Sequence, residues 1–339
     1  MRLALAVLIV VGHAGCDSCG DTGVNELPDA PIMDSAEPDA PPLDAPITGG
    51  VLVVTVSPPG PANNDPATWG GVVAYEIASD NGTATPITGI DRTLLADPVA
   101  VIYRPSSQEI FIGERHGNNA ADGVAGSIAR FAYSPTSRAF TPSGRITAAN
   151  ITSGVHDMVF HPTTGELFAC NVSTGISRFT FSGNTATANG TLGDGACRGV
   201  SISPNGSTLF MSTAGNVIRR FELANGTELS PTTATGAPGL HFMAQRQGQL
   251  YIAAIDAAKI YRFQINANNT LSELAPIETI TNPSAVAFSE SSQEMFVAGH
   301  RTTPVVGRYR FDLANDTWIP TAELALGAST GGLVLLPIR

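Results

Sequence analysis

Basic residues are scarce in this chain of 339 residues, in which Lys259 is the only lysine and the other residues of this charge are arginines. Charged residues make up 14% of the chain, and no run of Lys and Arg occurs. Because a nucleic-acid-binding surface needs such a basic patch, we exclude nucleic acid as a partner. After the N-terminal segment, no apolar run approaches the roughly 20 residues of a membrane-spanning helix, which excludes a multi-pass membrane protein.

The usual signatures of bound cofactors are also missing. The sequence has no His-x-x-x-His pair, calcium loop, phosphate loop or dinucleotide fingerprint. Residues 327–331 match the Gly-x-Ser-x-Gly elbow of hydrolases by letters, but that elbow needs a strand, a sharp turn and a helix. Here the segment leads into an expected strand, so we interpret it as a loop. We predict no cofactor, with a divalent cation as the alternative.

The N-terminus indicates export. Residues 1–15 combine Arg2, an apolar stretch at 3–12 and small residues before Cys16, which is the pattern of a signal peptide. The small residues directly before Cys16 resemble a bacterial lipobox, and this resemblance implies that Cys16 becomes the lipidated N-terminus. We expect a lipid-anchored protein of the bacterial cell envelope, periplasmic or at the cell surface. If Cys16 is not lipidated, the protein is secreted.

The segment after Cys16 is predicted to be a disordered tether. Residues 16–48 are rich in Pro, Asp and Ala, and residues 17–48 contain eight acidic residues and no basic one. Such a composition cannot bury enough apolar surface to fold. The remaining residues, 49–339, carry little net charge and are expected to form a single domain, which we take to be monomeric.

A short phrase recurs through residues 49–339 and sets the expected fold. An Arg followed by a Phe occurs in five copies, and Tyr75 marks a degenerate first copy. The copies are Arg130-Phe131, Arg178-Phe179, Arg220-Phe221, Arg262-Phe263 and Arg310-Phe311. The aromatic residues are 42 to 56 positions apart, a spacing typical of β-propeller blades. Because the Arg recurs in all five full copies, we predict that it is structural, stacked on an aromatic ring or bonded to a carbonyl.

The strand pattern within the repeats gives the number of blades. First strands are expected to begin near residues 98, 156, 198, 240, 284 and 332, each followed by a turn and further short strands. The strand at 332–336 has no partners after it, and the strand at 51–56 has no first strand before it. The two therefore complete one blade and close the ring. We predict an all-β fold, a single six-bladed propeller, with seven blades as the alternative.

The phrase Ser203-Pro-Asn-Gly206, followed by Leu209-Phe-Met211 and the strand ending at Phe221, resembles the repeats of bacterial lactonase-like and YVTN-type propellers. The resemblance covers about residues 50–339 as a blade pattern. Members of the lactonase-like family usually have seven blades, so six blades are a departure. The resemblance implies a hydrolase acting on a lactone or sugar ester.

Polar residues that differ from blade to blade are expected at one rim of the ring, around the mouth of its central channel. They lie just after second strands or next to first strands, where propeller loops usually bind ligands. The candidate ligand-binding residues are Asp97, Arg115, His116, Asn171, Arg198, His300 and Arg301. Glu114, His156, Asp157 and His241 are the candidate catalytic residues, because carboxylates and imidazoles supply acid–base chemistry or bind a metal. The alternative is that all of these are loop residues bonded to backbone and water.

Cys170 and Cys197 fall at the same rim in adjacent blades. In an exported protein they are expected either to form a disulfide or to remain two buried thiols.

Two functions follow from these observations. The first is a membrane-tethered binding module for a protein, glycan or small molecule. The second is the lactonase-like hydrolase that the resemblance implies.

Overall fold

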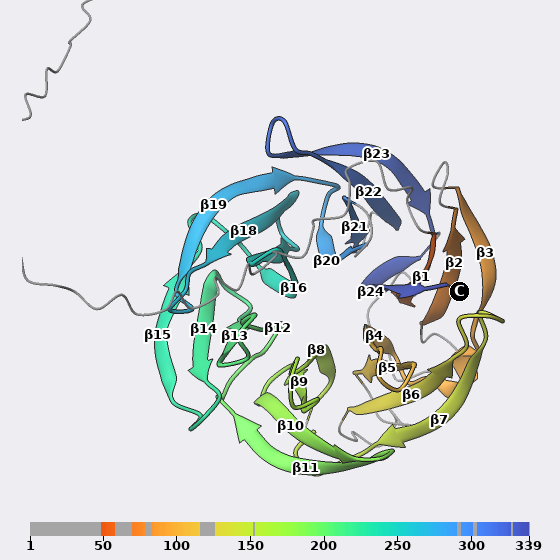
Figure 1. The fold of residues 1–339 in the computed structure, drawn as a ribbon, viewed down its shortest axis with the longest axis horizontal. Helices are drawn as coiled ribbons and strands as arrows, with labels where there is room; N and C mark the ends of the chain where they lie inside the picture. Colours follow the sequence, from red (N-terminus) through yellow and green to blue (C-terminus); the bar gives the residue numbers. More distant parts are fainter. Residues whose placement is uncertain are drawn as a thin grey trace, which may run out of the picture. The chain divides into compact units, whose positions relative to one another are not determined.

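The computed structural model describes residues 49–57, 70–78, 83–115, 126–151, 153–289, 293–300, 304–326 and 328–338. Within these residues the chain forms six four-stranded antiparallel sheets arranged as a ring (Figure 1). This confirms the six-bladed β-propeller, and the alternative of seven blades is wrong. Among the described residues one short 3-10 helix occurs, η2 (Arg92–Leu94), which precedes the second blade. Over the same ranges, no helix has the length and apolar character to span a bilayer.

Each blade has an innermost strand, two middle strands and an outermost strand (Figure 1). The innermost strands, from blade 1 to blade 6, are β24 (Ser329–Pro337), β4 (Pro98–Arg104), β8 (Val155–Phe160), β12 (Gly199–Ile202), β16 (Leu240–Arg246) and β20 (Pro283–Phe288). The second strands are β1 (Gly50–Ser57), β5 (Glu109–Glu114), β9 (Leu167–Asn171), β13 (Thr208–Ser212), β17 (Gln249–Ala254) and β21 (Glu294–Gly299). The third strands are β2 (Gly71–Ile77), β6 (Ser127–Tyr133), β10 (Gly175–Ser182), β14 (Val217–Glu222), β18 (Lys259–Ile265) and β22 (Val305–Asp312). The outermost strands are β3 (Ala84–Ile90), β7 (Phe140–Ile146), β11 (Thr185–Leu192), β15 (Glu228–Thr233), β19 (Leu271–Glu278) and β23 (Thr317–Ala325).

The C-terminal strand closes the ring, as the sequence predicts. Strand β24 pairs with β1, with Val51 opposite Leu336 and Val53 opposite Val334. The hydroxyl of Thr55 donates to the carbonyl of Val99 in blade 2 at 2.9 Å and accepts from the amide of Gly332 at 2.8 Å. The junction is therefore fixed both to its own blade and to the next one.

The core lies between the blades. Second strands such as β5 and β9 are buried along their whole length, because neighbouring blades cover both faces. Outermost strands such as β15 are mostly exposed. Large aromatic side chains of the second strands, including Phe111, Phe168 and Phe210, are completely buried and fill the space between sheets.

The repeated arginines have the structural role that their regularity predicts. Arg130 in β6 forms an ion pair with Glu109 in the neighbouring strand β5, with Nη2 2.7 Å from Oε1. Its guanidinium lies 5.2 Å from the ring centre of Phe111 and 5.8 Å from that of Phe181 in the next blade. Three further arginines stack on the cross-strand aromatic in the same way: Arg178 on Phe168, Arg262 on Tyr251 and Arg308 on Phe296. Arg220 instead donates to the carbonyl of Ser230 at 3.1 Å.

In the sixth blade the predicted position of the repeat is wrong by two residues. Arg308, rather than Arg310, lies opposite Phe296, and it pairs with the buried Glu294. Tyr309 then takes the buried place of the repeated Phe, whereas Arg310 is exposed. Residues 308–311 contain two Arg–aromatic pairs in succession. The ion pair with Glu294 is made by the arginine of the first pair, so that pair takes the position of the repeat.

Candidate functional site

Five consecutive blades each bring one basic side chain to the same end of the ring. These residues follow a second strand, precede an innermost strand or lie near its start. They are Arg115 after β5, His156 in β8, Arg198 before β12, His241 in β16 and His300 after β21. We call them the axial cation cluster. Arg115, Arg198, His241 and His300 all depress the pKa of His156, so their charges act at one place.

Two histidines of the cluster lie at positions where the regular strand pairing is interrupted. The register between β8 and β9 breaks between Val155 and Asp157, and that between β16 and β17 breaks between Leu240 and Met243. Breaks of this kind are β-bulges, which bend a strand and redirect a side chain.

The same break recurs in blades 2 and 6, where Val99 and Ser284 take the position. The bulge is thus a structural feature of the repeat. Of these four blades with a bulge, only blades 3 and 5 have a histidine at the bulge.

His156 is the centre of the cluster. Its side chain is buried, with its ring centre 5.5 Å from that of His241 and 5.9 Å from that of Phe242, on which it stacks with an interplanar angle of 22°. Burial holds the pKa of His156 well below its usual value, and the neighbouring cations lower it further. At neutral pH the ring is therefore uncharged. The sequence pattern missed Phe242, although its position directly after His241 is a usable signal.

The contact with Arg198 assigns the tautomer of this neutral ring. Nη1 of Arg198 lies 3.4 Å from Nε2 of His156. A guanidinium has only donors, so Nε2 must accept and the ring proton is on Nδ1. Nδ1 is buried and has no hydrogen-bond partner within the part of the chain that the structure describes. A buried N–H without an acceptor is costly, so this position calls for an acceptor that the described residues do not supply.

The two arginines of the cluster differ in their surroundings. Nε of Arg115 lies 2.8 Å from Oδ2 of Asp97, so much of its charge is balanced. Arg198 has no carboxylate partner among the described residues, and burial together with the charge of Arg115 lowers its pKa. His300 donates from Nδ1 to the carbonyl of Thr330 at 3.1 Å. Arg198 is therefore the member whose positive charge is least compensated.

Asp157 lies beneath the cluster rather than within it. Its carboxylate accepts from the amides of Met158 at 2.8 Å, Val200 at 2.9 Å and Met243 at 3.3 Å. Burial raises its pKa to about 7 although these three hydrogen bonds favour the ionised form. The carboxylate is only slightly accessible and all of its bonds are internal, which does not favour the catalytic role considered for it.

Glu114 is also committed internally. It is completely buried, accepts from the amide of Ala96 at 2.8 Å, and contacts the hydroxyl of Ser127 and the guanidinium of Arg145. Burial lowers the pKa of Arg145. A carboxylate enclosed in this way has no oxygen left for a substrate, so the geometry does not favour Glu114 as a catalytic group.

The remaining predicted residues are bonded within the protein or lie outside the described residues. Asn171 is buried and donates to the hydroxyl of Ser177 at 2.8 Å. His116 and Arg301 lie outside the described residues, as does the predicted lipidation site Cys16.

The structure joins Cys170 and Cys197 by a disulfide, with their Cα atoms 5.3 Å apart. Cys170 is in β9 of blade 3 and Cys197 directly precedes Arg198 at the start of blade 4. The bond thus holds Arg198 close to blade 3, which carries His156.

A metal site is not formed by the described part of the chain, where no group of three His, Cys, Asp or Glu side chains is suitably placed. The described residues therefore give no support to the divalent cation that the sequence analysis named as an alternative.

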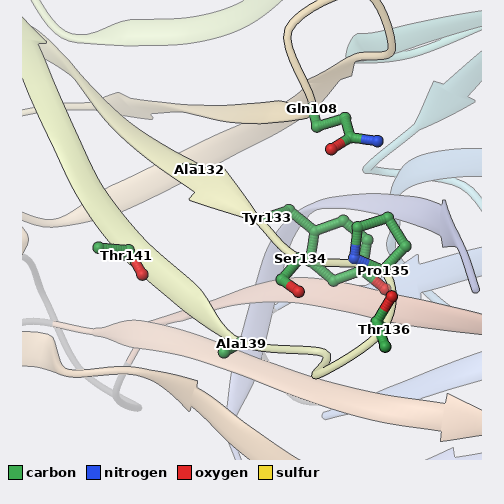
Figure 2. Close-up of a pocket in the computed structure, with 8 residues that line it drawn as sticks. All are labelled: Gln108, Ala132, Tyr133, Ser134, Pro135, Thr136, Ala139 and Thr141. Atoms are coloured by element: carbon green, nitrogen blue, oxygen red, sulfur yellow. The ribbon is translucent and has the colours of Figure 1, made fainter.

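A surface depression of about 290 Å³ lies elsewhere, at the end of blade 2 where β5 begins and β6 ends (Figure 2). It is lined by Gln108, Ala132, Tyr133, Ser134, Pro135, Thr136, Ala139 and Thr141. The hydroxyl of Tyr133 donates to the carbonyl of Pro337 at 3.0 Å, and burial raises its pKa to about 12. The depression therefore offers no group that titrates near neutral pH.

No protein-family model matches the chain, and no curated protein matches it. Solved structures share the fold. A putative 6-phosphogluconolactonase from Bacteroides uniformis has 13% identity and a TM-score of 0.63, covering 85% of this chain and 100% of its own. The periplasmic gluconolactonase PpgL of Pseudomonas aeruginosa has 13% identity and a TM-score of 0.61, covering 86% of this chain and 100% of its own.

A chain of a nidogen/laminin complex is similar to nearly the same degree, with 10% identity, a TM-score of 0.60, and coverage of 85% of this chain and 98% of its own. At such identities the similarity establishes the β-propeller alone. The neighbours include a putative 6-phosphogluconolactonase, a gluconolactonase and a component of a protein complex.

Proposed function

We propose that this protein is a binding propeller whose axial cation cluster holds a small anionic ligand, such as a carboxylate or a phosphate. The observation that carries the proposal is the meeting of Arg198 and His156, in which an arginine without a carboxylate partner in the described residues lies beside a buried imidazole whose Nδ1–H has no acceptor. A ligand carboxylate or phosphate would balance the charge of Arg198, and an acceptor oxygen at Nδ1 would satisfy its N–H.

The electrostatics support this ligand class. Hydrogen bonds between a charged donor and an anionic acceptor are about twice as strong as neutral ones, and partial burial strengthens them further. His241 and His300 add basic side chains to the cluster, whereas Arg115 is largely balanced by Asp97. Because the described carboxylates nearest the cluster are bonded internally, they do not compete with a ligand for Arg198.

The setting proposed for this site is the bacterial cell envelope. A signal peptide at 1–15, a lipid on Cys16 and a tether at 16–48 would present a monomeric propeller to solutes outside the cytoplasm. These elements rest on the N-terminal sequence pattern and on the composition of the tether.

Hydrolysis of a lactone or sugar ester is the second candidate, and the fold shared with two solved lactonases favours it. The site supports it less well. Neutral His156 carries its proton on Nδ1 and uses Nε2 to accept from Arg198, so the lone pair that a general base needs is occupied. Glu114 and Asp157 are buried in internal bonds.

Titration calorimetry of the mature protein with phosphate, citrate and gluconate, and with glucose as the neutral control, tests the proposal. We expect saturable binding of at least one anion and none of glucose. No binding of any of the three would overturn the proposal. Turnover of glucono-1,5-lactone in the same preparation would favour hydrolysis instead.

A further inference from the structure

Three successive blades are tied together by a single carboxylate. Oδ1 of Asp157 accepts from the amide of Met158 in β8, and Oδ2 accepts from the amides of Val200 in β12 and Met243 in β16. Side-chain bonds that join three separate strands at one point fix the spacing of those strands.

One member of the axial cation cluster lies on, or directly before, each of the bonded strands, close to the bond. His156 directly precedes Asp157, Arg198 lies two residues before Val200, and His241 lies two residues before Met243. The backbone that Asp157 fixes is thus the backbone that places these three basic side chains.

We propose that Asp157 is a positioning residue of the anion site, which holds β8, β12 and β16 at the spacing that brings His156, Arg198 and His241 together. This inference rests on the proposed function. It also explains why an ionisable residue, Asp157, is found at a buried position where a catalytic role is not favoured.

A carboxylate suits this task for two reasons. Its two oxygens accept several N–H groups, whereas an amide of the same shape has only one accepting oxygen. Its negative charge also offsets the mutual repulsion of the basic groups above it. All of its hydrogen bonds go to backbone amides, so this compensation does not occupy the side chains that would meet a ligand.

The titratable groups that act on His156, the residue directly before Asp157, are those of the cluster. His156 lies on the same strand as Asp157, Arg198 directly precedes β12, His241 lies in β16, and Arg115 and His300 come from the flanking blades. Because burial raises the pKa of Asp157 to about 7, replacing it changes both the spacing and the charge. The two effects act oppositely on His156. Loss of the negative charge lowers the pKa of His156, whereas loosened strands admit water and raise it.

The test is the variant Asp157→Asn, with Arg130→Met as a control that loses a buried ion pair far from the cluster. In the folded Asp157→Asn variant, phosphate or citrate affinity should fall by about tenfold or more, the size of one hydrogen bond to a charged group. The control should bind as the wild type does. Unchanged affinity in a folded Asp157→Asn protein would overturn the inference.

A readout without ligand separates this inference from the proposed function. The pKa of His156, followed by NMR, should rise in Asp157→Asn if the strands separate, and a further fall would show that Asp157 supplies charge alone and would overturn the positioning role. If the wild type binds none of the anions but the pKa of His156 rises, the proposed function fails and the positioning role stands. If Asp157→Asn does not fold, Asp157→Glu keeps the charge but displaces the carboxylate. It should also weaken binding, and wild-type affinity in that variant would overturn the inference.

Discussion

Nη1 of Arg198 lies 3.4 Å from Nε2 of His156, so two basic side chains from neighbouring blades meet without an intervening carboxylate. Like groups in contact raise the free energy of the empty site, because their charges repel whenever both are protonated. The imidazole of His156 avoids this repulsion by staying neutral, and its burial favours the neutral form as well. The pair therefore offers one fixed positive charge and one neutral donor.

Arg198→Gln should weaken anion binding by about 10- to 100-fold, because one charge-assisted hydrogen bond contributes roughly 1.5–3 kcal/mol. Calorimetry with the anion that the wild type binds best provides the measurement. Arg310→Gln removes the same charge from an exposed position in blade 6 and is the matched control. Equal losses in the two variants would contradict a specific role for Arg198.

The dependence of stability on pH should change when Asp157 is replaced. The folded-state pKa of His156 is below the ordinary 6.5, so the unfolded chain binds more protons below that pH and the free energy of unfolding decreases as the pH falls. The pKa of Asp157 is raised from 3.8 to about 7, so between these values the folded chain binds more protons and the free energy of unfolding increases as the pH falls. The two contributions oppose each other below pH 6.5.

We therefore expect Asp157→Asn to lose stability more steeply than the wild type as the pH falls below 6.5. Urea denaturation at a series of pH values measures this difference. Histidines elsewhere contribute equally to both proteins and cancel. The pKa of His156 measured in the variant gives the change in its own contribution, and curves that are parallel after this correction would show that Asp157 does not titrate in this range.

Removing the disulfide should destabilise the domain. The bond spans 27 residues, and a loop of this size corresponds to about 3.5 kcal/mol of the free energy of unfolding. The double variant Cys170→Ala/Cys197→Ala should show this loss in denaturant titrations. Wild-type protein unfolded under reducing conditions should match the variant, and a reductant should have no effect on the variant itself.

Arg130→Met should destabilise strongly without affecting the ligand. It leaves the buried Glu109 without its partner, a change that costs about 3–5 kcal/mol. Thermal and chemical denaturation measure the loss. Arg310→Met, at an exposed position, should stay within about 0.5 kcal/mol of the wild type. Reduced anion affinity in Arg130→Met would contradict a purely structural role for the repeated arginines.

Cys16→Ser should release the protein from the membrane fraction, because the predicted lipid is attached at that residue. Fractionation of cells followed by intact-mass measurement gives the answer, since each acyl chain adds a defined mass. A mature N-terminus other than Cys16, without added mass, would rule out lipidation.

The fold was predictable because it repeats. The spacing of Phe131, Phe179, Phe221 and Phe263 and the unpaired strands at the two ends give six blades and their closure. The one error, Arg310 in place of Arg308, arose where the sequence offers two adjacent matches. Pairing with Glu294 decides between them, and the register of a strand is set by such cross-strand partners rather than by its own letters.

The site was predictable only as a set of chain positions. Strand order brings His156, Arg198 and His241 to one rim, but sequence position does not tell which polar groups are already bonded. Glu114 and Asp157 look like catalytic carboxylates in the sequence, yet the structure buries both in internal bonds. Their partners Arg145, Val200 and Met243 lie 31, 43 and 86 positions away, beyond the reach of a local pattern.

Pairing of β24 with β1 joins the two most distant parts of the domain, since Gly332 and Thr55 are 277 positions apart. Contacts this far apart form late in folding, because the chain must first lose the entropy of a very long loop. His300 finds its acceptor, the carbonyl of Thr330, only when β24 is in place. Assembly of the cluster is therefore coupled to synthesis of the chain through this strand, and an unfinished polypeptide would have blades before it had a complete site.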